Sequence, residues 1–234
     1  MLTAPMTLTR SQVAQLQGNT YHLQANEWGS SAPFSITTDG CPGFRIATSA
    51  ISKAPNGGPG AYPSLYKGCH WGNCTANSGL PRTVTEVQAP GTVTTSAATT
   101  TVTTGTWSTV YDIWWDPSST PSGGGQLEMM IWLTKLGPIQ PAGALVAGNV
   151  AIGDRTYDVW KGSASPGGIV SYVLTSPSTS ITNLDLGPLA ADAAGRGYMA
   201  AAWFLIGVEF GFEPRQGGAG LAVDSFTICT PAGC

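Results

Sequence analysis

Hydrophobic and polar residues alternate along most of this chain in short runs with a period of two. Residues with β-branched or aromatic side chains dominate these runs, and Gly, Pro, Asn and Ser separate them. Such spacing is typical of an antiparallel β-sandwich or barrel. The pattern predicts strands at Thr20–Leu23, Phe34–Thr37, Gly43–Thr48, Thr83–Val87, Gly91–Thr104, Ser108–Trp115, Gln126–Thr134, Gly148–Ile152, Arg155–Lys161, Ile169–Thr175, Ala201–Gly211 and Gly220–Cys229.

One segment departs from this pattern and predicts a helix. Leu186–Met199 is rich in Ala, places Leu189, Ala193 and Arg196 at helical spacing, and follows Asp185 as a candidate N-cap. The length of 234 residues suits one large sandwich, and neither a boundary nor a repeat divides the sequence. We therefore expect a single domain over residues 1–234, all-β apart from one short helix.

Alternation assigns side chains to the two faces of each predicted strand. In Gln126–Thr134 it places Glu128, Met130 and Trp132 on one face, which mixes an acid, a thioether and an indole. The other face is purely apolar and belongs in a core between sheets: Leu127, Met129, Ile131 and Leu133.

The same rule groups polar residues on two further runs. Asp112 shares a face with Trp114 in Ser108–Trp115. Glu213 shares a face with Glu209 and Arg215 in the run that leads to Pro214. We expect both faces to border a cleft rather than the core.

Glu128 and Glu213 are lone acids within apolar, strand-like surroundings. An ionised carboxylate that faces a dry core is costly, so it pairs, shifts its pKa or faces a functional cavity. A glycoside hydrolase needs two such carboxylates, one on either side of a sugar bond. The alternative for each is an exposed strand acid in a salt bridge.

The composition favours a neutral, polyhydroxylated ligand. Charged residues make up 10% of the chain, against about 25% in typical domains, and eight Trp and seven Tyr accompany many Gly, Thr and Ser. A net charge of -3 without a basic stripe argues against nucleic acid. No apolar run approaches the roughly 18 residues of a membrane span.

The five cysteines include two pairs with equal spacing, Cys69 with Cys74 and Cys229 with Cys234. We expect Cys69 and Cys74 to close a small disulfide loop, the alternative being a metal knuckle with His70. Cys41 is then left over, unless it pairs with a tail cysteine. Disulfides indicate an oxidising compartment. The N-terminus lacks a signal-peptide pattern, so we expect the mature part of a secreted protein with an initiator Met.

Seven short motifs follow one another over nearly the whole chain, and their order and spacing are informative together. They are Asn26-Glu-Trp-Gly29, Tyr62-Pro-Ser-Leu-Tyr-Lys-Gly-Cys-His-Trp71, Tyr111-Asp-Ile-Trp114, Glu128-Met-Met-Ile-Trp-Leu133, Gly137-Pro-Ile-Gln-Pro141, Gly211-Phe-Glu-Pro214 and Gly220-Leu-Ala-Val223. Together they resemble glycoside hydrolase family 12, and within it the bacterial, actinomycete-like branch. The resemblance implies a concanavalin-like jelly-roll sandwich of two antiparallel sheets.

The resemblance also implies catalytic roles. Glu128 corresponds to the family's nucleophile and Glu213 to its general acid/base. Asp112 corresponds to an aspartate that hydrogen-bonds the nucleophile, and its alternative is a turn or ladder carboxylate. Carboxyl groups of a retaining pair lie roughly 5–5.5 Å apart, so that one attacks the anomeric carbon while the other protonates the leaving oxygen.

The remaining implied site residues concern substrate binding. Trp28 and Asn26 match a sugar platform and a hydrogen-bonding residue on the non-reducing side. Trp132 is expected near the scission point. His70 resembles a cleft histidine, with a hydrogen-bonded loop histidine as the alternative, and Met130 either touches the sugar ring or fills the core.

Two features depart from the family pattern. Arg215 stands where bacterial relatives usually carry Trp, and it either lies beside Glu213 and lowers the pKa of that acid or pairs with Glu209, which we favour. The relatives also place an N-terminal cysteine opposite the position of Cys41, and none is present here.

The sequence thus predicts a secreted, monomeric, retaining endo-β-1,4-glucanase that acts on β-1,4-glucan without cofactor or metal. One alternative is a xyloglucan-specific endoglucanase, which differs in loop shape. The other is a lectin or carbohydrate-binding module, which has no need for two carboxylates in apolar strands at one cleft.

Overall fold

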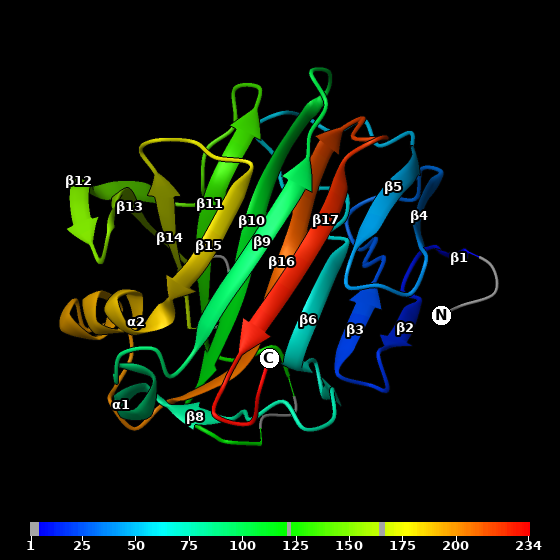
Figure 1. Cartoon of the computed structure of the whole chain (residues 1–234). Helices are drawn as coiled ribbons and strands as arrows, with labels where there is room; N and C mark the ends of the chain where they lie inside the picture. Colours follow the sequence, from blue (N-terminus) through cyan, green and yellow to red (C-terminus); the bar gives the residue numbers. More distant parts are fainter. Residues whose placement is uncertain (1–4, 121–122, 164–166) are drawn as a thin grey trace.

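The alternating runs form two stacked β-sheets in the computed structural model, which describes residues 5–120, 123–163 and 167–234. The expected initiator Met1 lies outside the described residues. Figure 1 looks onto the smaller sheet, with the larger sheet behind it. The smaller sheet has the order β1 (Met6–Leu8), β4 (Phe34–Thr38), β5 (Phe44–Ser49), β17 (Ala222–Cys229), β9 (Thr94–Thr100) and β15 (Ser180–Asp185).

The larger sheet carries the longest strands. Its order is β12 (Ala144–Ile152), β13 (Arg155–Gly162), β14 (Ile169–Leu174), β11 (Leu127–Leu136), β10 (Thr106–Asp116), β16 (Phe204–Gln216), β6 (Ser64–His70), β3 (Tyr21–Gln24) and β2 (Val13–Leu16). Two short strands, β7 (Asn73–Cys74) and β8 (Arg82–Thr83), pair with β6 and β16. Strand pairing is antiparallel except between β11 and β14, which are parallel. The predicted all-β sandwich is confirmed.

The main core fills the space between the sheets. It contains the apolar face of β11 as predicted, because Leu127, Met129, Ile131 and Leu133 are at most 1% exposed and belong to this core. A second, smaller apolar cluster lies on the other face of the larger sheet: Tyr62, Val110, Met130, Trp132, Ile139 and Ile169. The alternation therefore separated the core face from the outer face correctly.

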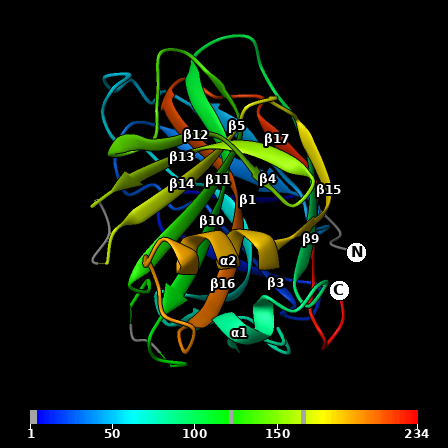
Figure 2. The same cartoon turned by 90° about the vertical axis from the view of Figure 1, so that its left-hand side faces the viewer.

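Two helices lie side by side at one end of the sandwich (Figures 1 and 2). The predicted helix is α2 (Leu186–Gly195), capped by Asp185, which accepts a hydrogen bond from the Gly187 amide. It ends before Met199 because Arg196 is the C-cap and Gly197 has a positive φ of 77°. No helix among the described residues is long and apolar enough to cross a membrane.

The strand predicted at Thr83–Val87 is wrong. Val84–Val87 forms α1, because Thr83 and Glu86 make a capping box that satisfies the first amides of the turn. The β-branched residues of this segment indicated a strand, but Val84 and Val87 are buried on the inner side of a helical turn.

Two disulfides close short loops. The expected bond between Cys69 and Cys74 is confirmed and lies across the β6–β7 hairpin. Cys229 bonds Cys234, a pairing that the sequence left open. Cys41 is a free, exposed thiol, so it is the cysteine left over.

Candidate active site

A cavity of about 590 Å³ lies on the face of the larger sheet that points away from the smaller one. It is lined by Asn26, Trp28, Tyr62, His70, Trp71, Asp112, Trp114, Gly124, Gly125, Glu128 and Glu213. A second cavity of about 760 Å³ adjoins it and shares Trp28, Glu128 and Glu213. The two carboxylates therefore stand where the cavities meet.

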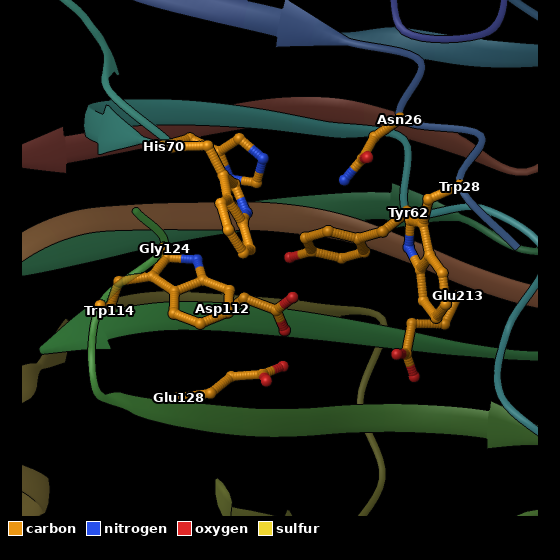
Figure 3. A pocket seen from close by; sticks show the side chains of 11 residues that line it. Asn26, Trp28, Tyr62, His70, Asp112, Trp114, Gly124, Glu128 and Glu213 are labelled. Atoms are coloured by element: carbon orange, nitrogen blue, oxygen red, sulfur yellow. The ribbon is translucent and has the colours of Figure 1, made fainter. Parts of the chain in front are cut away.

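Three neighbouring strands deliver the acids to this place. Glu128 comes from β11, Asp112 from the central β10 and Glu213 from β16. The register sets Glu128 opposite Trp114 and Glu213 opposite Ser108, both on β10. Figure 3 shows all three carboxylates pointing into the same space, with Glu213 across from Asp112 and Glu128.

Glu213 is a nearly buried acid whose surroundings act on its pKa in opposite directions. Its side chain is 12% exposed, and burial raises its pKa above the ordinary value. Arg215, with Nη1 3.5 Å from Oε2, and the Ser108 hydroxyl, which donates a 3.0 Å hydrogen bond to Oε2, lower that pKa in part. The environment thus favours the protonated form while keeping it titratable.

Asp112 is buried in the middle of the acidic group. Burial raises its pKa well above the usual range, and the charges of Glu128, Glu213 and Glu209 raise it further. Its Oδ1 has no hydrogen-bond partner within the described part of the chain. A carboxyl group in this position takes up a proton readily and shares a negative charge with its neighbours.

Arg215 lies beside Glu213, so the favoured pairing with Glu209 is wrong. Its Nε donates to the Gly57 carbonyl at 3.0 Å, and its guanidinium lies 5.9 Å from the centre of the Trp132 ring. Side chains two residues apart on a strand share a face, so Arg215 lies next to Glu213. Glu209 is on the same face but four residues further along the strand, and it makes other polar contacts.

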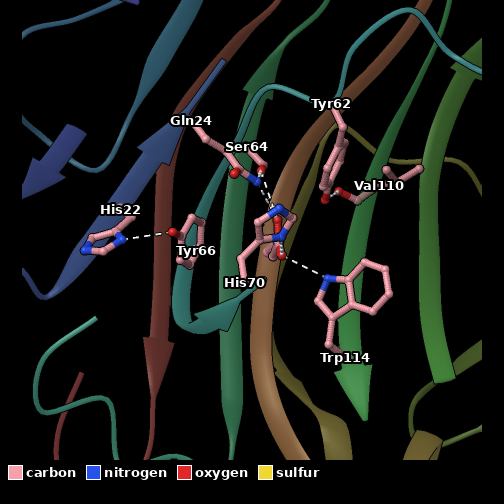
Figure 4. A network of polar contacts seen from close by, with 9 residues as sticks. His22, Gln24, Tyr62, Ser64, Tyr66, His70, Val110 and Trp114 are labelled. Carbon is pink, nitrogen blue, oxygen red and sulfur yellow. Dashed lines mark hydrogen bonds and ion pairs between the residues drawn. The ribbon is translucent and has the colours of Figure 1, made fainter. Parts of the chain in front are cut away.

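Glu209 is fully buried at the centre of a polar network that the sequence did not reveal. Figure 4 shows the side chains of Gln24, Ser64, His70 and Trp114 turned toward one another in this network. Gln24 and Ser64 donate to its Oε2 at 3.0 and 3.1 Å. His70 Nδ1 lies 2.5 Å from its Oε1, and Trp114 Nε1 donates to the same atom at 2.9 Å. His70 is therefore both a cavity-lining and a hydrogen-bonded residue, so the two alternatives for it coincide.

Tyr62 is a second residue that sequence reasoning did not single out as part of the site. It is buried, lines the cavity, and donates a 3.4 Å hydrogen bond to the Val110 carbonyl. Burial raises its pKa well above the usual range, and the nearby carboxylates add to that effect, so the hydroxyl stays protonated. The sequence held one indication of this role, because Tyr62 begins the motif that ends at Trp71.

Trp28 and Asn26 stand at one side of the cavity (Figure 3). The indole of Trp28 is 62% exposed, which suits a platform for a ligand rather than core packing. Asn26 has a left-handed φ of 41°, and its carbonyl accepts a 2.9 Å hydrogen bond from the Tyr62 amide, which fixes the loop against the start of β6.

Met130 and Trp132 lie on the predicted face and line the second cavity, but both are almost covered. They are 3% and 2% exposed and pack with Ile139 from the segment 137–143. Contact of either side chain with a sugar stays a prediction. No group of three or more His, Cys, Asp or Glu suited to a metal ion occurs among the residues that the structure describes.

Comparison with known proteins gives one family. The model of the family described as glycosyl hydrolase family 12 matches residues 19–230. A protein of Mycobacterium tuberculosis described as a probable cellulase, Cel12b, is 35% identical over 123 residues, which are 53% of this chain and 80% of that protein.

Solved structures agree over nearly the full length. The endoglucanase Cel12A from Rhodothermus marinus is 37% identical with a TM-score of 0.88, covering 97% of this chain and 98% of that one. A metagenome-derived endoglucanase of the same family is 34% identical with a TM-score of 0.89, covering 96% and 97%.

Proposed function

We propose that this chain, which belongs to glycosyl hydrolase family 12, is a retaining endo-β-1,4-glucanase with Glu128 as nucleophile and Glu213 as general acid/base. The observation that carries the proposal is the convergence of these two carboxylates, from β11 and β16, on the junction of two cavities. Glucosyl units on both sides of the scissile bond then have room, as cleavage within a polymer requires.

The first chemical step joins the sugar to Glu128. The Glu128 carboxylate attacks the anomeric carbon, and Glu213 gives its proton to the departing glycosidic oxygen as that bond breaks. The raised pKa of Glu213 supports this role, because an acid must hold its proton at the working pH.

The second step releases the sugar. Glu213, now ionised, takes a proton from water, and the water oxygen attacks the anomeric carbon and displaces Glu128. Arg215 and the Ser108 hydroxyl stabilise the ionised form of Glu213 at this stage. Asp112 is a positioning residue in this scheme, because a shared proton between Asp112 and Glu128 would orient the nucleophile.

Substrate binding follows from the cavity walls. The exposed Trp28 indole offers a flat apolar face to a glucosyl ring, and Asn26 offers an amide to its hydroxyl groups. Aromatic and uncharged polar side chains line much of both cavities beside the acids, which suits a neutral β-1,4-glucan. The disulfides support secretion into an oxidising compartment, and we expect the protein to act as a monomer.

The roles of the two acids are separable by leaving group. Glu128→Gln should abolish turnover of both a soluble β-glucan and a dinitrophenyl cellobioside. Glu213→Gln should lower turnover of the glucan by about 10³-fold but retain a burst of dinitrophenolate, because that leaving group needs no proton. Wild-type-like turnover of β-glucan by either variant would overturn the assignment.

A parallel product analysis tests the substrate. Carboxymethylcellulose, mixed-linkage β-glucan and xyloglucan should be compared, with early products examined by proton NMR for retention of the β-anomer. Cleavage of xyloglucan alone would establish the branched-substrate alternative. Oligosaccharide binding without cleavage of any polymer would establish a binding module.

A further inference from the structure

We propose that Trp71 is a second aromatic platform of the cleft, which binds a glucosyl unit distant from the scissile bond at the end opposite Trp28. The inference rests on the proposed function for the identity of the ligand, a β-linked glucan chain. Three features of Trp71 support the platform itself: its exposure, its backbone conformation and the packing of its ring.

Exposure singles out two aromatic side chains. Among the residues that the structure describes, Trp28 and Trp71 are the strongly exposed aromatic side chains, at 62% and 61%, and both line the cavity that holds Glu128 and Glu213. Trp107, Trp114, Trp115 and Trp132 are at most 8% exposed. Large exposed apolar groups gathered at one cavity mark a binding surface rather than ordinary surface scatter.

The backbone holds Trp71 in a conformation that a bulky residue rarely adopts. Trp71 and Gly72 form the two-residue loop of the β6–β7 hairpin, with φ values of 48° and 79°. Positive φ at both positions is the pattern of a type I′ turn, which favours Asn-Gly, not Trp-Gly. A bulky residue kept in a left-handed conformation on an exposed turn points to a function for its side chain.

The surroundings keep the indole in place. The Cys69–Cys74 disulfide closes the hairpin directly behind the turn. Gly124 supports the ring so closely that a Cβ there would lie 2.8 Å from the indole, and Gly123 lies beside it. The His70 imidazole meets the ring edge-on, with ring centres 6.3 Å apart. Trp71 is therefore exposed but preorganised, as a stacking platform should be.

Trp71 and the loop that carries Trp28 lie at opposite ends of β6. Asn26 packs at the start of β6 and Trp71 follows its last residue, His70. The strand between the two ends has 7 residues and therefore spans about 20 Å. Figure 3 likewise places Trp28 and His70 at opposite sides of the pocket. We therefore expect an oligosaccharide of several units, and not a single sugar, to contact both side chains.

Trp71→Asn tests the platform, because Asn-Gly is the preferred sequence for this turn. Loss of one stacking contact should lower the ratio of kcat/KM for cellohexaose to that for an aryl cellobioside by about tenfold. The melting temperature should rise, since the turn is relieved. A residue with a merely structural role would instead show a lower melting temperature and an unchanged ratio, which would overturn the proposal.

Three further variants complete the test. Trp71→Phe should keep most of the ratio, because it retains an aromatic face. Gly124→Ala should lower the ratio, because the new Cβ displaces the indole. Val146→Asn, which removes another exposed apolar side chain on β12, serves as the matched control. A decrease in Val146→Asn equal to that of Trp71→Asn would contradict a specific platform.

Direct binding separates this inference from the proposed function. Cellohexaose should be titrated calorimetrically against Glu128→Gln with and without Trp71→Asn, and the affinity should fall about tenfold. Equal affinities would overturn the platform even if the wild type hydrolyses β-glucan. Absence of hydrolysis by the wild type, with the affinity difference present, would overturn only the enzymatic function.

Discussion

Glu209 and Glu213 stand on the same face of the same strand, two alternations apart, yet they occupy opposite kinds of environment. Glu209 is fully buried and accepts hydrogen bonds from Gln24, Ser64 and Trp114, with His70 Nδ1 2.5 Å away. Glu213 is slightly exposed, borders both cavities, and has the Ser108 hydroxyl and Arg215 as its polar partners among the described residues.

The two carboxylates differ in the number of polar groups that contact them. Polar contacts on several sides fix the position of the Glu209 side chain, and through it those of His70 and Trp114 at the cavity wall. Glu213 has fewer donors and a pKa raised by burial, so that its proton can leave and return. On one strand, the same residue type thus serves as a structural anchor and as a candidate proton donor.

The largest effect should come from Glu213→Gln. Removal of a general acid typically costs 10²–10⁴-fold, and we expect about a 10³-fold loss of kcat/KM on mixed-linkage β-glucan. Stability at neutral pH should not fall. The raised pKa means that the ionised form destabilises the folded state as pH rises through that pKa, and glutamine carries no charge. Initial rates and thermal melts at pH 7 measure both.

Glu209→Ala should show the reverse, with the main loss in stability. It leaves the donors of Gln24, Ser64, His70 and Trp114 without their acceptor, so the free energy of unfolding should fall by about 3 kcal/mol. Chemical denaturation measures this. The comparison fails if Glu209→Ala is as stable as the wild type, or if it is the variant that abolishes turnover while remaining folded.

Arg215→Met should change the pH profile more than the rate. The cation lowers the pKa of Glu213, so its removal raises that pKa further. In the proposed mechanism Glu213 acts in its protonated form, so the basic limb of the kcat/KM profile should move to higher pH. Arg215→Lys, which keeps the charge, is the matched control and should leave the limb near its wild-type position. A shift of the limb to lower pH would contradict the assignment of the acid.

Ser108→Ala should give the smallest effect, in the same direction. The hydroxyl donates one hydrogen bond to the ionised form of Glu213, and a single neutral hydrogen bond contributes about 1 kcal/mol. We expect a small upward shift of the basic limb and little change in stability. Parallel profiles of Ser108→Ala and Arg215→Met would rank the two partners, and a larger shift in Ser108→Ala would make the hydroxyl, not the cation, the stronger influence on the acid.

Much of the fold was predictable because one physical rule governs it. Each long strand buries one face in the core, so alternation fixed both the strand and the orientation of Glu128 and Asp112. The rule failed at Thr83–Val87, where a local capping box outweighed β-branched side chains. The preference for Glu209 as the partner of Arg215 neglected distance, because Glu209 is six residues away on β16, about 20 Å at the rise of a strand, whereas Glu213 is only two residues away.

The unpredicted parts of the site depend on which strands become neighbours. Glu209 gathers donors from β3, β6 and β10, and sheet order is not encoded in a local pattern. The conformation of Trp71 was equally hidden, because Trp-Gly is not a sequence signal for a turn with positive φ at both positions, even though the disulfide that closes this loop was expected. Family resemblance, not periodicity, assigned the division of roles between Glu128 and Glu213.

The parallel pair of β11 and β14 has a consequence for how this cleft can change over evolution. Because β12 also runs parallel to β11, the chain must recross the sheet between Leu136 and Ala144 before it continues. That return path, residues 137–143, covers Met130 and Trp132 and forms one wall of the second cavity. These residues lie outside the paired strands, so a change in the length of this segment would reshape the wall of the second cavity without a change in strand register.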